Sequence, residues 1–245
     1  MNKESKIFGI YPVLEAIKSD TVIDKLFVQK GISNPKIDQI VKQLEQEHVT
    51  ISEVPIEKLD KLTRSNHQGV VAITSPISFH TLEEVVEKAL AKESAPLFII
   101  LDQISDVRNF GAILRTAECT GVDAVIIQKK GGAPVSGDTV KTSAGAIFKM
   151  PICKVDHIKD AMFYLQGSGI KVVAASEKAS QSVYEVDFKQ AVAIVMGSEG
   201  KGVSKSVQQL ADESAGLPLK GEINSLNVSV ACGAFLYETV RQRSL

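Results

Sequence analysis

The chain is organised around its closing stretch, Leu217-Pro-Leu-Lys-Gly-Glu-Ile-Asn-Ser-Leu-Asn-Val-Ser-Val-Ala-Cys-Gly-Ala-Phe-Leu-Tyr-Glu-Thr-Val-Arg-Gln-Arg243. Its first part predicts a short extended piece and a turn, and either Ser225 or Asn227 is a good cap for the helix that follows. That helix is apolar on one side (Val228, Ala231, Cys232, Phe235, Leu236, Thr239) and almost as apolar on the other (Val230, Gly233, Ala234, Tyr237). A helix of this kind is buried on two sides, so we expect one face to pack on a sheet and the other on a partner subunit.

The region before this helix alternates buried strands with helices. Continuous apolar runs predict strands at 96–101, 124–128, 170–174 and 191–196, and helical periodicity is found at 82–90, 111–119, 157–166 and 205–210. This alternation favours a mainly parallel sheet with helices on both faces.

The first part of the chain predicts a smaller α/β module. Helices are expected at 12–19, 35–47 and 56–62, and strands at 25–29, 50–53 and 69–74. Ser75-Pro76 interrupts this pattern, because proline lacks an N–H donor and disfavours helix in the residue before it. We therefore predict an N-terminal domain of residues 1–75, a linker of 76–81 and a second domain of 82–245.

Composition excludes several classes of protein. The start, Met1-Asn-Lys-Glu-Ser-Lys6, is polar and no apolar run approaches the length of a membrane span, so we expect a cytoplasmic protein with no signal peptide. The three cysteines are far apart in apolar company, which predicts small buried hydrophobes and neither disulfides nor a metal site. A net charge of −1 neither indicates nor excludes RNA as a partner.

Polar residues cluster where the strand at 96–101 ends. Asn109 lies just before a helix expected to start at Gly111, and Arg115 lies one to two turns inside it; this is where parallel sheets bind ligands. The plain alternative is that Asn109 only caps the helix and that Arg115 pairs with Glu118.

The strand at 191–196 runs into Gly197, Gly200 and Gly202, whose backbone can approach a ligand closely. The spacing Gly-x-x-Gly-x-Gly differs from the dinucleotide pattern Gly-x-Gly-x-x-Gly, which disfavours a nucleotide-dependent dehydrogenase. The plain alternative is a glycine turn with an exposed Glu199. For Ser225 and Asn227, the plain alternative is helix capping alone.

Taken together and in this order, three segments resemble the signature motifs of the SpoU/TrmH family of RNA ribose 2′-O-methyltransferases, within the SPOUT superfamily. They are Asn109-Phe-Gly-Ala-Ile-Leu-Arg115, Val195-Met-Gly-Ser-Glu-Gly200, and Leu217-Pro-Leu through Ser225-Leu-Asn-Val-Ser229 to Arg241-Gln-Arg243. Near the start, Gly9 with Val13-Leu-Glu-Ala16 and His67-Gln-Gly-Val70 resemble the substrate-binding domain of the bacterial members that methylate a guanosine of large-subunit ribosomal RNA.

The resemblance implies a fold that ordinary topology rules would exclude, a parallel sheet with a deep trefoil knot near the C-terminus. It implies S-adenosyl-L-methionine as cofactor, held by Gly197, Gly200, Leu217, Leu219 and Leu226, and less specifically by Thr142. Five residues would surround the reacting hydroxyl: Asn109, Arg115, Glu199, Ser225 and Asn227. RNA contacts would come from Arg64, His67, Gln68 and Arg108. One departure from the family pattern is Val107, where many members carry proline.

Chemistry refines two of these roles. Guanidinium is effectively always protonated, so we expect Arg115 to act as an electrostatic clamp on the phosphate and the developing alkoxide. Glu199 is then the candidate proton acceptor, or it orients Arg115. The resemblance thus implies an rRNA guanosine 2′-O-methyltransferase, and the two apolar faces of the C-terminal helix predict a dimer through that helix. A tRNA ribose methyltransferase and a non-catalytic ribosome-assembly factor are the alternatives.

Overall fold

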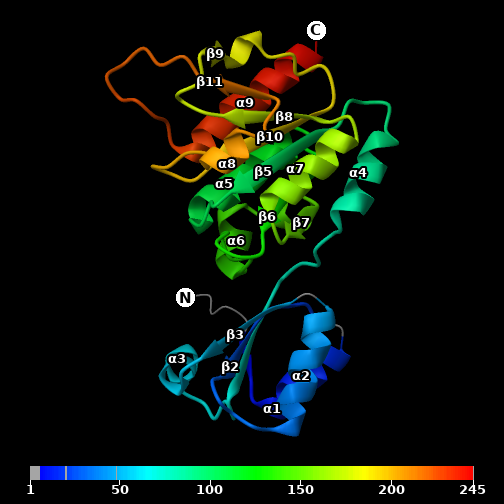
Figure 1. The fold of residues 1–245 in the computed structure, drawn as a ribbon, viewed down its shortest axis with the longest axis vertical. Coiled ribbons are helices and arrows are strands. Elements are labelled where there is room, and N and C mark those ends of the chain that lie inside the picture. The colour runs from blue at the N-terminus through cyan, green and yellow to red at the C-terminus, as the bar shows by residue number, and fades with distance from the viewer. Residues whose placement is uncertain (1–5, 20, 48, 245) are drawn as a thin grey trace. The chain divides into compact units, whose positions relative to one another are not determined.

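The computed structural model describes residues 6–19, 21–47 and 49–244. The chain divides into two compact units (Figure 1). One extends to Ser78 and includes Val135–Asp138, and the other consists of Phe79–Pro134 and the chain from Thr139 onward. The first five residues of the N-terminal domain expected at 1–75 lie outside the described residues.

The first unit is built on a four-stranded sheet of order β1-β4-β2-β3. The strands are β1 (Lys6–Phe8), β2 (Ile23–Gln29), β3 (Thr50–Val54) and β4 (Val70–Thr74), and the helices are α1 (Ile10–Lys18), α2 (Pro35–Gln46) and α3 (Ile56–Leu62). Apolar residues of α1 and α2, such as Val13 and Ile40, pack with Leu26 and Ala72 of the sheet in one core. Of these elements only β1, three half-buried residues long, was not predicted.

Several loops lie together at one edge of this small sheet, the edge formed by strand ends. β4 is antiparallel to β1 and β2, and β3 is parallel to β2, so β1, β2 and β3 all end at the edge where β4 begins. Backbone bonds close this edge: Gly9 N–H donates to Val70 O, Gln29 N–H to Gly69 O and Lys30 N–H to Val54 O.

The second unit has a seven-stranded sheet of order β7-β6-β5-β10-β8-β11-β9, with every pair parallel. Its strands are β5 (Leu97–Asp102), β6 (Ala124–Gln128), β7 (Ile152–Val155), β8 (Lys171–Ala175), β9 (Gln181–Ser182), β10 (Val192–Gly197) and β11 (Glu213–Gly216). The predicted parallel sheet is confirmed. The shorter strands β7, β9 and β11 were not predicted, because two to four residues give no readable periodicity.

Helices complete this unit: α4 (Leu82–Leu90), α5 (Val107–Cys119), α6 (Gly137–Thr142), α7 (Ile158–Gly167), α8 (Lys205–Gln208) and α9 (Val228–Arg243). Residues of α4, α7 and α8 share one core with alternate residues of the central strands, such as Phe98 and Val195. The intervening strand residues, such as Ile99 and Ile194, are also fully buried. α9 packs against α5 and β10 (Figure 1).

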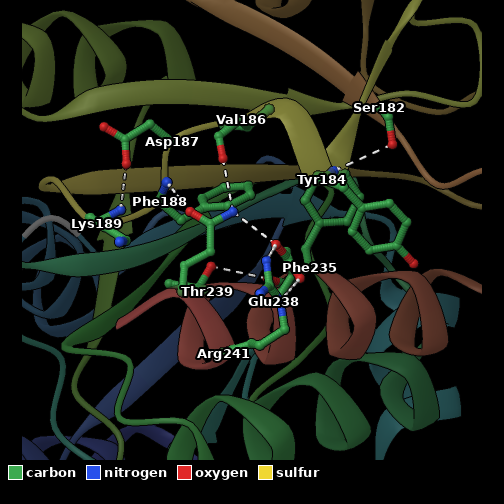
Figure 2. Close-up of polar contacts among 11 residues, drawn as sticks. Ser182, Tyr184, Val186, Asp187, Phe188, Lys189, Phe235, Glu238, Thr239 and Arg241 are labelled. Atoms are coloured by element: carbon green, nitrogen blue, oxygen red, sulfur yellow. Dashed lines mark hydrogen bonds and ion pairs between the residues drawn. The ribbon is translucent and has the colours of Figure 1, made fainter. Parts of the chain in front are cut away.

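The C-terminal end of α9 is fixed by a polar cluster (Figure 2). The Gln242 side chain accepts from Phe188 N–H at 2.9 Å and donates to Val186 O at 2.9 Å and to Glu238 Oε1 at 2.8 Å. The Arg243 guanidinium donates to Phe188 O and Gln190 O, and to Ala95 O and Pro96 O just before β5. The end of α9 is therefore anchored to the segment between β9 and β10 and to the start of β5.

Two expectations are corrected. Cys153 and Cys232 are buried as predicted, but Cys119 is exposed, because it ends α5 on the side away from the core. α5 begins at Val107 rather than at Gly111. Within the ranges that the structure describes, no helix is both long and apolar enough to cross a membrane.

Candidate functional site

The helix that contains Asn109, α5, begins earlier than the position of Gly111 suggested. Asp106 is the cap of α5, and its Oδ1 accepts from the backbone N–H of Arg108 at 2.8 Å and of Asn109 at 2.9 Å. Asn109 therefore lies in the first turn of α5, and its side chain does not cap the helix. The interpretation of Asn109 as a plain cap is wrong.

Three of the expected site residues form one closed hydrogen-bonded cluster. Asn109 Nδ2 donates to Glu199 Oε2 at 3.1 Å, and Asn227 Nδ2 donates to Glu199 Oε1 at 2.8 Å and to Asn109 Oδ1 at 2.9 Å. The three side chains come from α5, from the loop after β10 and from the start of α9. The cluster thus joins segments that are 90 and 118 residues apart in sequence.

Asn227 also caps α9. Its Oδ1 accepts from the backbone N–H of Ser229 at 3.0 Å and from the Ser229 hydroxyl at 2.6 Å. Ser225, the other candidate cap, lies exposed in the preceding loop. Capping and cluster formation therefore use different atoms of Asn227, the carbonyl oxygen for the helix and the amide nitrogen for Glu199 and Asn109.

The loop after β10 folds tightly back on itself. Gly202 N–H donates to Ser198 O at 2.8 Å, and a Cβ added at Gly197 would lie 2.0 Å from Gly202 C and from Val203 N. Gly200 and Gly202 have φ values of 83° and 67°, which only glycine adopts readily. The glycines therefore build the turn itself, and the turn places Glu199 beside Asn109 and Asn227.

A pocket of about 590 Å³ lies next to this cluster. Among the residues that line it are five of the six expected cofactor contacts, Gly197, Gly200, Leu217, Leu219 and Leu226. Glu199 and Ser225 line it as well. Its volume lies within the roughly 300–1,000 Å³ of small-molecule sites, and its wall combines apolar side chains with backbone at glycines.

The sixth expected cofactor residue, Thr142, does not line the pocket. Its side chain packs on α5, where a Cβ added at Gly111 would lie 2.0 Å from Thr142 Oγ1. The Thr142 hydroxyl donates to Val107 O at 3.1 Å and to Thr139 O at 3.3 Å. In this structure Thr142 supports α5 and does not reach the pocket wall.

Arg115 is exposed on α5, two turns beyond Asn109. Among the residues that the structure describes, its guanidinium takes part in no ion pair or hydrogen bond. Glu118 pairs instead with Lys149 at 3.5 Å, so the plain Arg115–Glu118 pairing is wrong. Arg108, in the first turn of α5, is exposed as well. Both cations are therefore accessible to an external anion.

The sequence did not identify the loop after β8 as part of the pocket. Ala175, Ser176, Glu177 and Lys178 line it, together with Phe235 of α9. The available signal was positional, because β8 is a parallel neighbour of β10 and its carboxyl end opens on the same edge. Glu177, Lys178 and Glu199 are the charged residues among those that line the pocket.

Two of the expected RNA contacts have internal roles in the first unit. His67 is buried; its Nδ1 accepts from Gly69 N–H at 3.0 Å and its Nε2 lies 3.1 Å from Asp60 Oδ1. Gln68 Oε1 accepts from Ile10 N–H at 3.0 Å, at the first residue of α1. Arg64 is exposed. Of the three expected contacts in this unit, Arg64 is the one whose side chain makes no hydrogen bond or ion pair with another described residue.

Comparisons with known proteins agree with the division of the chain into two units. Residues 96–237 match the model of the SpoU rRNA Methylase family, and residues 6–80 match a family described as RNA 2′-O ribose methyltransferase substrate binding. A protein of Staphylococcus aureus (strain MSSA476), named as a member of the TrmH family of tRNA/rRNA methyltransferases, is 34% identical over 98% of this chain and 97% of its own. A similarly named protein of Bacillus subtilis (strain 168) is 32% identical over 97% of this chain and 96% of its own.

Among solved structures, an AdoMet-bound rRNA methyltransferase from Sinorhizobium meliloti has a TM-score of 0.61 and 26% identity, and the match covers 96% of this chain and 86% of that one. The matched family model spans more than half of the sequence, and the pocket and the Asn109–Glu199–Asn227 cluster lie inside it. The chain therefore belongs to the SpoU/TrmH family, a family of S-adenosylmethionine-dependent RNA methyltransferases.

Proposed function

We propose that this protein transfers a methyl group from S-adenosylmethionine to the 2′-hydroxyl of a ribose in RNA, and that the nucleotide is a guanosine of large-subunit ribosomal RNA. The observation that carries the proposal is the position of the Asn109–Glu199–Asn227 cluster against the pocket, with Glu199 belonging to both. A transferase of this kind must orient a hydroxyl and a methyl donor and must handle one proton.

The pocket suits the cofactor in size and chemistry. Gly197 and Gly200 line the pocket without side chains, and Leu217, Leu219 and Leu226 offer apolar contact for a purine ring. The carboxylates of Glu177 and Glu199, which line the pocket, can attract the positively charged sulfur of the cofactor. When bound there, S-adenosylmethionine supplies an electrophilic methyl group on a positively charged sulfur.

Glu199 is the proposed proton acceptor. Each of its oxygens already receives one N–H donor, from Asn109 and from Asn227, and each carboxylate oxygen keeps a further lone pair. The two amides fix the carboxylate's position, and Ser225 on the pocket wall can hydrogen-bond the substrate. Arg115, permanently charged and unpaired among the described residues, is the proposed clamp for the phosphate and for the developing alkoxide.

The first unit is the proposed RNA-binding domain, with the border to the catalytic domain at the predicted linker 76–81. The substrate-binding family matched by residues 6–80 supports this assignment. Arg64, and Arg108 at the start of α5, are the proposed phosphate contacts, since both are exposed. His67 and Gln68 contribute by holding the shape of their loop.

Two further features of the family reading are part of the proposal. The first is the trefoil knot, in which part of the chain around the pocket would pass through a loop that precedes α9. After β11 the chain turns back so that α9 packs on β10, and this path is compatible with a knot. The second is a homodimer through α9. Val230 and Tyr237, two turns apart on that helix, are 57% and 58% exposed, and both belong to the face that the sequence assigns to a partner subunit.

The alternatives are a tRNA substrate and a non-catalytic assembly factor. Titration calorimetry with S-adenosylmethionine, followed by transfer of a radiolabelled methyl group to ribosomal RNA and to tRNA, separates all three. The proposal expects cofactor binding, label in ribosomal RNA, and a labelled dinucleotide that resists alkaline cleavage. Label in tRNA alone would support the first alternative, and no cofactor binding would support the second. A monomeric mass by light scattering would contradict the dimer.

A further inference from the structure

The first unit exposes one aromatic ring at its loop-bearing edge. Tyr11, in the first turn of α1, is 59% exposed, and it is the one aromatic residue of residues 6–19, 21–47 and 49–78 that lies largely in solvent. Tyrosine presents a large, flat, amphipathic ring that loses little conformational entropy on binding, which suits it to stacking against a ligand.

Lys36 covers one side of this ring. Its Nζ lies 4.1 Å from the ring centroid of Tyr11 and donates a hydrogen bond to the Tyr11 hydroxyl. This bond and the ammonium charge lower the pKa of the Tyr11 hydroxyl. The contact joins the first turn of α1 to the first turn of α2. With a cation on one face and more than half of the side chain accessible, the opposite face of the ring can receive another flat ring.

The loop of His67, Gln68 and Gly69 fixes the start of α1. Gln68 accepts from Ile10 N–H at 3.0 Å, next to Tyr11, and His67 in turn accepts from Gly69 N–H at 3.0 Å. Gln68 and Gly69 have φ values of 51° and 82°, so the loop adopts a left-handed conformation that its internal bonds hold. The residues expected to touch RNA therefore position the ring that is exposed beside them.

Cations surround this position. Lys30 lies on the connection from β2 to α2, Lys36 in the first turn of α2, and Arg64 on the connection from α3 to β4; all three are exposed. Both connections meet at the same edge of the sheet, as the bonds from Gln29 N–H to Gly69 O and from Lys30 N–H to Val54 O show. The carboxylate of Asp60, on α3, is engaged by His67 at 3.1 Å.

We propose that this edge is a binding site for an unpaired RNA base, which stacks on Tyr11 while Lys30, Lys36 and Arg64 contact the adjoining phosphates. Single-stranded RNA is recognised by stacking on aromatic side chains combined with cationic contacts to the backbone. A base held inside a duplex cannot reach the ring. The inference rests on the proposed function, because it names how the substrate RNA is held.

The test is fluorescence anisotropy with the full chain and labelled oligoadenylate, as a single strand and as the duplex with oligouridylate. Tyr11→Ala weakens binding of the single strand by about 5- to 150-fold, the usual range for one stacked base, and changes duplex binding little. Tyr11→Phe keeps the ring and binds nearly as tightly as the unchanged chain. Lys36→Gln lowers the dependence of log affinity on log salt by about 0.7.

Matched controls lie elsewhere on the molecule. Tyr164→Ala removes a tyrosine of α7 that is 39% exposed, and Lys18→Gln removes an exposed cation at the opposite end of α1; neither affects single-strand binding. Equal affinity of Tyr11→Ala and the unchanged chain overturns the inference, as does an equal loss in Tyr11→Phe, or single-strand binding no tighter than duplex binding in the unchanged chain.

Calorimetry with S-adenosylmethionine distinguishes failure of the proposed base-binding site from failure of the proposed function. Tyr11→Ala and the unchanged chain are expected to bind the cofactor equally. If the unchanged chain binds no cofactor and methylates no RNA, the proposed function fails while the anisotropy still decides the role of Tyr11.

Discussion

The side-chain amide of Asn227 donates to Glu199 Oε1 at 2.8 Å, so the residue that begins the last helix also holds the carboxylate beside the pocket. This one contact ties the start of α9 to the turn after β10. It makes the two functions of Asn227 separable by mutation, because its oxygen caps the helix and its nitrogen serves the site.

Asn227→Asp is predicted to keep the helix cap and to lose activity. Aspartate accepts from Ser229 N–H as asparagine does, but it offers no donor to Glu199 and adds a second negative charge there. We expect a melting temperature close to that of the unchanged chain and a fall in kcat of about 10²-fold from the displaced carboxylate. Asn227→Ala should lose a similar activity and also about 1 kcal/mol of stability. Near-normal kcat in Asn227→Asp would show that the cluster does not serve catalysis.

Glu199→Gln and Arg115→Lys separate proton transfer from charge stabilisation. If Glu199 accepts the proton, Glu199→Gln loses most of kcat, because an amide cannot take up the proton. The Gln oxygen keeps one of the two amide donors while its NH2 group faces the other, so S-adenosylmethionine binding is measured beside kcat. Arg115→Lys should reduce kcat at every pH, since a lysine lacks the forked donors. Steady-state kinetics across pH are the measurement. Near-normal turnover in Glu199→Gln together with an inactive Arg115→Lys would rule out the carboxylate as base.

Gly197→Ala is predicted to disrupt the pocket. The added Cβ would lie 2.0 Å from Gly202 C and from Val203 N, where backbone atoms cannot move aside cheaply. Overpacking of this kind costs about 1–3 kcal/mol or more. Thermal unfolding and cofactor calorimetry should show lower stability and weakened binding. Gly221→Ala, whose added Cβ meets no atom within 4 Å, is the matched control and should change neither. Unchanged stability in Gly197→Ala would mean that the turn after β10 is looser than described.

Glu238 is predicted to make stability depend on pH in the acid range. Hydrogen bonds from Arg241 at 2.7 Å and 2.8 Å lower the pKa of the Glu238 carboxyl below its ordinary value of 4.5. Its contribution is therefore fully present above pH 4.5 and is lost as the pH falls through the lower folded pKa. Glu238→Gln should lose about 0.5–1 kcal/mol at neutral pH, a small value because Arg241 is screened by solvent.

The difference in melting temperature between Glu238→Gln and the unchanged chain should shrink as the solution is acidified. Glu87→Gln, on the exposed side of α4, is the control and should show no such dependence. A difference that is constant from neutral to acid pH would mean that the ionised carboxylate contributes nothing.

The three cysteines are predicted to react with a thiol reagent at very different rates. Cys119 is exposed, whereas burial raises the pKa of Cys153 and of Cys232 to about 12. Since the thiolate is the reactive form, the native protein should show one fast thiol and two that react only on unfolding. Cys119→Ser should remove the fast phase. Two fast thiols in the native protein would contradict the packing of α9 or of β7.

The elements that the sequence predicted best are those with a strong repeat of apolar residues. The helices at 56–62 and 82–90 and the strand at 124–128 begin and end where expected. The start of α5 was missed because Gly111 looked like a helix opening. In fact glycine is required there by the close approach of Thr142, and the helix begins at the Asp106 cap. The contact with Thr142 thus explains why residue 111 is a glycine, which the local sequence pattern had suggested was the start of the helix.

The candidate site was predicted in its parts but not in its assembly. Asn109, Glu199 and Asn227 were expected together from the motif resemblance, whereas their mutual hydrogen bonds depend on how α5, β10 and α9 pack. His67 and Gln68 show the opposite case. The family resemblance suggested RNA contacts for them, and in the structure they accept from the backbone N–H groups of Gly69 and Ile10. No sequence pattern distinguishes this use from ligand binding, and their contact with RNA stays a prediction.

The most direct test of the central claim is a map of ribose methylation in ribosomal RNA. Cells with the protein, cells without it, and cells with only the Asn227→Asp chain should be compared by alkaline resistance along the large-subunit RNA and in tRNA. The account predicts one guanosine 2′-O-methyl group that is present with the unchanged chain and absent in the other two. Identical large-subunit maps in all three, or a loss confined to tRNA, would contradict it.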